Sequence, residues 1–326
     1  MSLGNTSFLL LCSILVFIMI PGLGYFYNGL TSSKAALSVL LLCFLTFSVV
    51  EIQWFTFGYS LVFSKDGNSF IGTFTNGGFS GMTSQDVSNE PIDFAFALYQ
   101  GMFAGLTPAL VVGAGSDKAR LLPKIIFILL WTTFVYDFIA YWCWNPNGFL
   151  KANGVLDFAG GSPVHIASGS SALAYMLILG NKGKNNEKTV AHSPANVLLG
   201  TILLWFGWNG FNGGSAFHAN ARASHAIVAT NLSAAAGSLT WLFFNYSKTK
   251  RFSALSFCCG AIAGLVCITP AAGYVSPGYA VLIGLFGSSF CYSGSLLKDK
   301  FGLDDTVLDF YVVGCIYCSW YWWRYW

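Results

Sequence analysis

Nine long apolar stretches, separated by short polar segments, dominate the chain. The hydrocarbon core of a bilayer is about 30 Å thick, so a helix that spans it needs roughly 20 apolar residues. Gly, Asn, Ser, Lys and Pro concentrate between the stretches, as in loops. The pattern predicts an all-α, polytopic transmembrane bundle. Its nine spans cover residues 7–27, 36–63, 92–114, 123–144, 163–180, 195–217, 224–246, 253–270 and 277–297.

The distribution of basic residues supports this number of spans independently. The first, third, fifth, seventh and ninth loops and their borders hold twelve Lys and Arg residues. The other loops hold only Lys65, Lys151 and Arg222. Because cytoplasmic loops are enriched in Lys and Arg, the alternation predicts a multi-pass protein with its N-terminus outside.

Composition excludes several classes of protein. The chain is 55% hydrophobic and 9% charged, whereas soluble domains carry roughly 25% charged residues. A net charge of +3, with basic residues in short loops, does not indicate nucleic acid as a partner. Seven cysteines lie in apolar runs without a CxxC pair, which predicts buried small side chains rather than a metal site. The run at residues 8–20 lacks a basic start and is interpreted as the first span, not as a signal peptide.

Ionisable residues within the predicted spans are the first candidates for chemistry, because burying them in a membrane is costly. Glu51 and Asp137 are interpreted as residues that hydrogen-bond to neighbouring helices, and Asp93 as an acid at a helix N-terminus. Asp157 and His165 differ, because a Gly-rich turn and a helix-starting proline lie between them. The Asp157 carboxylate can accept the backbone N–H groups of that turn. A buried His165 can be structural or can shuttle a proton.

Aromatic side chains at helical spacing are the second group. Tyr99 and Phe103 are four residues apart and share a helix face, and Trp208 and Phe211 are three apart on another helix. Trp144 ends the fourth predicted span. Aromatic faces attract cations and stacked rings can close a narrow path, although such pairs also serve for packing alone.

The motifs resemble those of the ammonium transporter/methylammonium permease/Rhesus family. The segment from Asp157 to His165 reads Asp-Phe-Ala-Gly-Gly-Ser-Pro-Val-His, which is similar to the family signature. Further matches, in family order, are Pro21–Gly29, Gln100–Phe103, Gly207–Ser215 and Gly302–Asp305. The Asn-Pro-Asn-Gly run after Trp144 is similar to the fungal branch of ammonium permeases.

The resemblance implies a fold and a function. The expected fold is the ammonium transporter fold, an inverted repeat in a homotrimer of eleven-helix protomers in the plasma membrane, with about nine of the eleven helices present here. The expected substrate is ammonium or ammonia, with methylammonium as an analogue, and no cofactor, metal or enzymatic reaction is expected. The implied roles are substrate binding by Trp144, Tyr99, Ser215 and Trp208, a pore gate of Phe103 and Phe211, pore lining by His165 and structural support by Asp157. Tyr99 stands where the family more often has Phe, as does Asn209 beside Trp208.

The C-terminal residues depart from the family pattern. After Asp305 the family has a run like Val-His-Gly-x-Gly-Gly, but this chain ends in a Trp- and Tyr-rich tail. Trp has the single codon TGG, so a shift of one base turns each Trp into Gly, and a shifted frame permits the family's run. We therefore predict an incomplete transmembrane domain at residues 1–305 and an out-of-frame tail at residues 306–326. Transport by this truncated chain is predicted to be impaired.

Two other functions were compared with transport. An ammonium sensor that binds without conducting fits the same residues, and the sequence does not separate it from a transporter. An intramembrane hydrolase would need a metal set or an activated nucleophile, but the HExxH and GxSxG motifs are absent.

Overall fold

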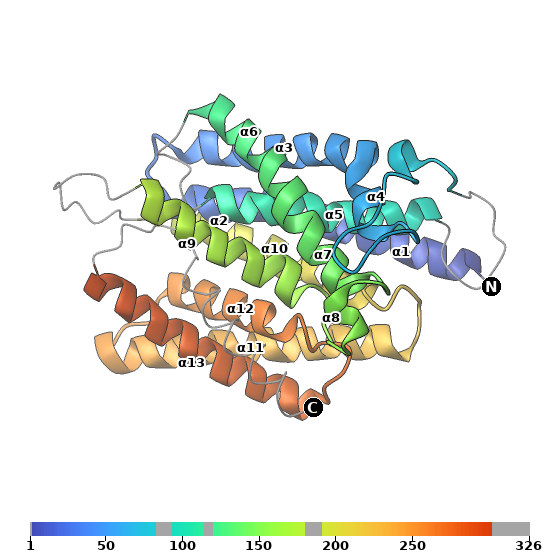
Figure 1. Cartoon of the computed structure of the whole chain (residues 1–326). Coiled ribbons are helices and arrows are strands. Elements are labelled where there is room, and N and C mark those ends of the chain that lie inside the picture. Colours follow the sequence, from blue (N-terminus) through green and yellow to red (C-terminus); the bar gives the residue numbers. More distant parts are fainter. Residues whose placement is uncertain (1, 83–92, 114–119, 180–190, 302–326) are drawn as a thin grey trace.

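A computed structural model describes residues 2–82, 93–113, 120–179 and 191–301 of the chain. Its helices form nine rods that lie roughly side by side (Figure 1). The rods are α1 (Ser2–Phe17) with α2 (Met19–Leu30), α3 (Ala36–Gln53) with η1 (Trp54–Gly58) and α4 (Tyr59–Phe63), α5 (Asp93–Gly113), α6 (Leu121–Trp131) with η3 (Thr132–Tyr136) and α7 (Asp137–Trp144), η4 (Gly161–Ile166) with α9 (Ala167–Leu179), α10 (Pro194–Gly214), α11 (Ala221–Thr249), α12 (Ala254–Ile268) and α13 (Pro277–Phe301). Two short helices, η2 (Gly77–Phe79) and α8 (Phe149–Ala152), lie in connections. The predicted all-α fold is confirmed.

Among the residues that the structure describes, six helical segments are long and apolar enough to cross a membrane, by length and composition. The helix α12 is apolar but has only 15 residues. Three rods contain a π-helical turn, η1, η3 or η4, that the hydrophobic pattern does not reveal. Such turns are often found at functional sites.

The first and sixth rods run antiparallel along each other. At one end the Ser193 N–H donates to the Gly29 carbonyl at 3.2 Å. At the other end a Cβ added to Gly214 would lie 2.7 Å from both Cys12 and Tyr99. Glycines permit this approach, since a Cβ at Gly210 would lie 2.5 Å from the Cβ of Leu15. Opposite directions of the first and sixth rods are what an inverted repeat of five helices plus five requires.

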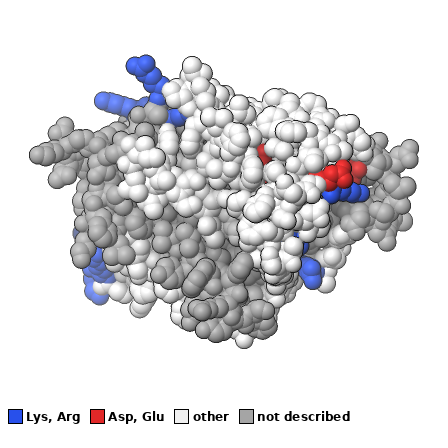
Figure 2. Space-filling model, viewed as in Figure 1, with Lys and Arg blue, Asp and Glu red and all other residues white. Residues whose placement is uncertain are grey.

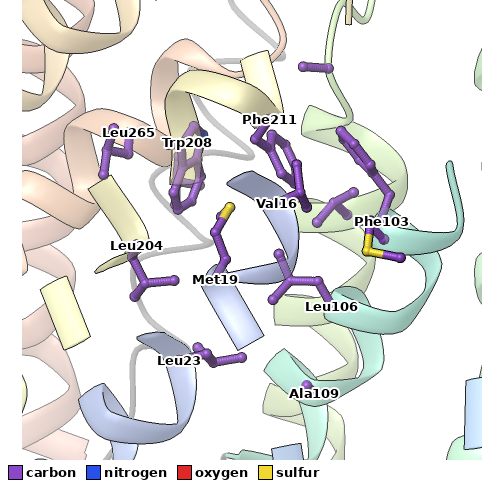
Figure 3. Packing of buried hydrophobic residues seen from close by; sticks show 14 of the residues in the cluster. Val16, Met19, Leu23, Phe103, Leu106, Ala109, Leu204, Trp208, Phe211 and Leu265 are labelled. Carbon is purple, nitrogen blue, oxygen red and sulfur yellow. The ribbon is translucent and has the colours of Figure 1, made fainter. Parts of the chain in front are cut away.

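The core lies where α1, α2, α5, α10 and α12 meet. Figure 3 shows Met19 and Leu106 among the side chains of this centre, close to the rings of Phe103, Trp208 and Phe211. Large apolar side chains such as Leu37, Ile178 and Phe286 are exposed on the outer faces of the rods. Apolar residues both inside and outside are expected of a bundle surrounded by lipid.

Charged side chains lie mainly toward the two ends of the bundle. In Figure 2 blue Lys and Arg side chains lie at the left-hand end and also toward the right, where red acidic side chains lie beside them. The orientation of the N-terminus stays a prediction. The tail at residues 306–326 lies outside the described residues, so its out-of-frame interpretation also stays a prediction.

The sequence predicts that Glu51 and Asp137 link neighbouring helices, and the structure differs between the two acids. The Gln53 Nε2 of α3 donates to Oδ2 of Asp137 on α7 at 2.7 Å, so Asp137 does join two rods. Glu51 Oε1 has no hydrogen-bond partner among the residues that the structure describes. The six buried cysteines and the partly buried Cys259 confirm that the cysteines in apolar runs act as small core residues.

Candidate functional site

The turn at Asp157 fixes the start of the fifth rod. Oδ1 of Asp157 accepts the N–H groups of Gly160 and Gly161, each at 2.8 Å, and Oδ2 accepts that of Ser162 at 2.6 Å. These are N–H groups that a helix N-terminus leaves without intrahelical partners. Gly160 has φ of 103°, which favours glycine. The predicted supporting role of Asp157 therefore has a clear geometric basis.

A cavity of about 360 Å³ lies beside this turn and beside the ends of α5, α7 and α10. Four of the predicted site residues line it: Phe103, Trp144, Asp157 and Ser215. Its other lining residues, which sequence reasoning did not select, are Phe63, Phe96, Gln100, Pro146, Lys151, Phe158, Ala216, Phe217, Arg222 and Tyr274. The cavity is thus largely aromatic, with a few charged groups at its wall.

Two of the three charged residues that line the cavity, Asp157 and Arg222, already have partners. The Asp157 carboxylate is already used by three backbone N–H groups. The Arg222 guanidinium carbon lies 5.9 Å from the centre of the Tyr274 ring, a cation–π geometry. Burial raises the pKa of the Tyr274 phenol, which therefore stays neutral at ordinary pH. A cation in the cavity would consequently meet aromatic faces and hydroxyl groups rather than a bare carboxylate.

The rings of Phe103 and Phe211 close one end of the cavity. They are stacked with centroids 4.1 Å apart and an interplanar angle of 29°. The Trp144 ring meets Phe103 edge-on, with centroids 6.0 Å apart. Phe103 is 1% exposed and Phe211 is fully buried. No gap separates two rings at this spacing, so a molecule that leaves the cavity along this line has to displace them.

Tyr99 lies behind the layer that the rings of Phe103 and Phe211 form. Its hydroxyl lies 3.0 Å from the Gly210 carbonyl oxygen, 2.7 Å from that of Phe211 and 3.3 Å from Ser215 Oγ. Ser215 Oγ in turn donates to the Phe211 carbonyl at 2.9 Å. Tyr99 is fully buried, so its hydroxyl holds the end of α10 rather than opening directly into the cavity.

His165 and Trp208 lie on the other side of the phenylalanine pair. The His165 ring stacks on Trp208 with centroids 5.4 Å apart, and on Phe211 at 5.9 Å. Trp208 Nε1 donates to Thr269 Oγ1 of the segment after α12 at 2.9 Å. His165 is 3% exposed, and its Nε2 has no hydrogen-bond partner within the described part of the chain. An unpaired ring nitrogen in a buried position is a donor or acceptor available to a small polar molecule.

The structure therefore orders the predicted residues along one line. Trp144 and Ser215 line the cavity, the Phe103 and Phe211 rings close it, and His165 lies beyond them. Trp208 shares the layer of His165 and does not line the cavity. Phe217, which sequence reasoning missed, packs against Tyr99 with centroids 6.2 Å apart. Its position depends on a backbone φ of 58°, which no local pattern in the sequence signals.

No cluster of three metal-ligating side chains occurs in the ranges that the structure describes. The fold and the site together define a multi-pass helical membrane protein in which an aromatic constriction separates a cavity from a buried histidine. The model of the Ammonium Transporter Family matches residues 7–316, and the chain belongs to that family.

Several proteins that are named ammonium transporters are similar to this chain. Ammonium transporter 1 of Schizosaccharomyces pombe is 46% identical over 308 residues, which cover 93% of this chain and 62% of that protein. Ammonium transporter MEP2 of Saccharomyces cerevisiae is 44% identical, over 96% of this chain and 65% of that protein. The crystal structure of Candida albicans Mep2 superposes with a TM-score of 0.90 at 43% identity, covering 97% of this chain and 71% of that one. The chain thus spans less than two thirds of the length of the Schizosaccharomyces pombe and Saccharomyces cerevisiae transporters.

Proposed function

We propose that this chain is an ammonium transporter of the fungal permease type, which recruits ammonium and passes it through the bundle as ammonia. The observation that carries the proposal is the order of layers: an aromatic cavity, a stacked phenylalanine pair, then a buried histidine with an unpaired nitrogen. The similarity to named ammonium transporters gives the substrate class. The proposed function is not enzymatic.

The geometry supports a sequence of steps. Ammonium enters the cavity and meets the face of Trp144 and the hydroxyl of Ser215. It gives its proton to solvent water in the cavity before the constriction, because carrying an uncompensated charge into a dry path is expensive. The Phe103 and Phe211 rings move aside for the neutral molecule, and His165 Nε2 then offers it a hydrogen bond. K⁺ and Na⁺ have no neutral form, so the same path rejects them.

The proposal extends to the setting of the protein. Homotrimer assembly, the plasma membrane and an external N-terminus are proposed on the family resemblance and on the charges of the loops. The cavity then opens to the outside, because it lies at the ends of α5, α7 and α10 near the loops predicted to be external. Impaired transport by the 326-residue chain itself is proposed from the tail that departs from the family pattern.

Uptake in cells that lack their own ammonium transporters tests the function. The 326-residue chain and a version with the reading frame restored past Asp305 are compared at low external ammonium. We expect growth and uptake of labelled methylammonium from the restored version, and little from the chain as it stands. Phe103→Ala in the restored version should change uptake, whereas Phe243→Ala on the exposed side of α11 should not.

The outcomes separate the candidate functions. Binding of methylammonium by the purified restored version without uptake by cells, at equal surface abundance, would support a sensor and reject transport. If the restored version shows neither binding nor uptake of methylammonium, the proposed substrate is refuted. Equal uptake by both versions would show that the tail does not impair the chain.

A further inference from the structure

A buried pair of polar side chains joins the second and fourth rods, away from the proposed path. Asp137 begins α7 directly after the π-turn η3, and Gln53 ends α3 directly before the π-turn η1. Asp137 is fully buried and Gln53 is 2% exposed. A polar pair in such a place is costly unless its hydrogen bonds are satisfied.

The hydrogen bonds around the pair are complete on one side only. Gln53 Nε2 donates to Asp137 Oδ2 at 2.7 Å and to Thr133 Oγ1 at 3.4 Å, so both of its N–H groups are used. Within the described chain, the remaining oxygens, Gln53 Oε1 and Asp137 Oδ1, have no hydrogen-bond partner. An ionised Asp137 would leave two unpaired acceptors in the same pair, with a full charge buried between helices.

The acidic and phenolic groups on the surrounding segments offer no compensation. Glu51 of α3 lies two residues from Gln53, Tyr136 precedes Asp137, and Tyr59 lies on α4, which packs against α7. Each of these side chains is neutral or negative. Glu51 Oε1 and the Tyr136 hydroxyl also have no hydrogen-bond partner among the residues described.

The cationic groups on and near α7 do not neutralise the Asp137 carboxylate, because they are too far from it or lie against other residues. Lys124 lies thirteen residues earlier on the same rod, which is about 20 Å along a helix. Lys151 lines the cavity beyond Trp144 and is exposed. His165 of η4 is stacked on Trp208 and Phe211. No salt bridge to Asp137 therefore occurs within the described residues.

We propose that Asp137 is a resident proton-binding site, in which a proton on Oδ1 is donated to Gln53 Oε1. With that proton, the acid and the amide form a reciprocal pair of two hydrogen bonds, and both unpaired oxygens are satisfied at once. The ligand of this site is a proton held in the resting protein. The site lies outside the proposed ammonium path, because neither residue lines the cavity.

The pair also has a positional role. Trp144 lies seven residues after Asp137, which is about two helical turns. Beyond Trp144, Asn145 Nδ2 donates to the carbonyls of Val62 and Ser64 at 2.9 and 3.1 Å. The fourth rod is thus hydrogen-bonded to the segment of the second rod both before and after Trp144 in the sequence. The neutral pair of Asp137 and Gln53 forms the bond that precedes Trp144.

Infrared difference spectroscopy of the purified 326-residue chain tests the proton directly. The carbonyl stretch of a protonated carboxylic acid is separate from the bands of carboxylates and amides. We expect such a band at neutral pH that is lost in Asp137→Asn and retained in Asp66→Asn, a matched change of an acid in the exposed connection after α4. The Asp137→Asn variant should keep the parent's thermal midpoint, because an Asn amide donates and accepts as the neutral acid does. Asp137→Leu should lower the midpoint.

A second comparison tests the partner. Gln53→Met removes both hydrogen bonds at similar volume, so the acid band of Asp137 should move to higher wavenumber as its hydrogen bond is lost. The absence of any band assignable to Asp137 would overturn the proposal. An Asp137 band that is unmoved in folded Gln53→Met would overturn the pairing with Gln53. Should Gln53→Met fail to fold, Gln53→Asn, which retracts the amide by one methylene, serves for the same shift.

Discussion

The Asp157 turn gives the sharpest quantitative prediction, because every bond that it loses on substitution is known. Asp157→Ala removes the acceptor of the Gly160, Gly161 and Ser162 N–H groups. These groups begin the rod that carries His165, so the change acts on the fold and on the proposed path together. Asp157→Asn should destabilise the protein less than Asp157→Ala, because the Asn side chain keeps one acceptor oxygen.

The magnitude follows from the hydrogen bonds. Each N–H left without a partner costs about 1–3 kcal/mol, which would give an upper limit of roughly 9 kcal/mol for three. Asp157 lines the cavity and is 7% exposed, so water can replace part of the loss. We expect Asp157→Ala to destabilise the protein by about 3–5 kcal/mol and Asp157→Asn by about 1–3 kcal/mol.

Thermal unfolding in detergent measures the effect. At roughly 2 °C per kcal/mol, extended from smaller domains, the midpoint of Asp157→Ala should fall by about 6–10 °C. Asp66→Asn provides the control, since the Asp66 carboxylate accepts a long hydrogen bond of 3.5 Å from Thr75 Oγ1 in an exposed loop. A midpoint for Asp157→Ala equal to that of the parent would refute the reasoning, as would an Asn variant less stable than the Ala variant.

Four further predictions follow from the same structure. In the version with the restored frame, His165→Ala should alter the selectivity of uptake for ammonium over K⁺ while assembly is unchanged, and unaltered selectivity would remove His165 from the path. Tyr99→Phe should cost about 0.5–1.5 kcal/mol and change uptake little, since only the hydroxyl that holds α10 is lost; abolished uptake would give Tyr99 a direct role. Cysteine introduced at the exposed Ser80 should be labelled in intact cells, and at Ser247 only after permeabilisation, and the reverse pattern would invert the topology. Sequencing of the coding DNA between Asp305 and Gly314 should reveal an inserted or deleted base, and an intact frame would show that the tail is genuine.

Much of the fold was predictable because every helix that spans the bilayer needs roughly 20 apolar residues. The predicted 36–63 coincides with Ala36–Phe63, and the predicted 163–180 with Gly161–Leu179. The predicted 7–27 corresponds to a longer segment that breaks at Ile18, into α1 and α2. The π-turns were not predictable, because each adds a single residue to a helical turn and leaves the apolar pattern nearly unchanged.

The candidate site was predictable in part. The bond pattern of Asp157 follows from local spacing, since a carboxylate shortly before a Gly-rich helix start can reach its N–H groups. The shared face of Tyr99 and Phe103 is likewise local, and their ring centroids lie 5.0 Å apart. The contact of Phe103 with Phe211 joins α5 to α10, more than a hundred residues later, and only the resemblance to a family suggested it before the structure was known.

The sequence by itself determined that the chain is a bundle of membrane helices, because period, length and loop charge are local properties that each segment carries alone. It also determined which few polar residues had to be explained. Only the tertiary structure decided which of them share a layer: Trp208 lies with His165 rather than in the cavity, Phe217 enters the aromatic wall, and Asp137 meets Gln53. These contacts depend on the rotation and height of one helix against another, which are set by the packing of all rods together rather than by any one segment.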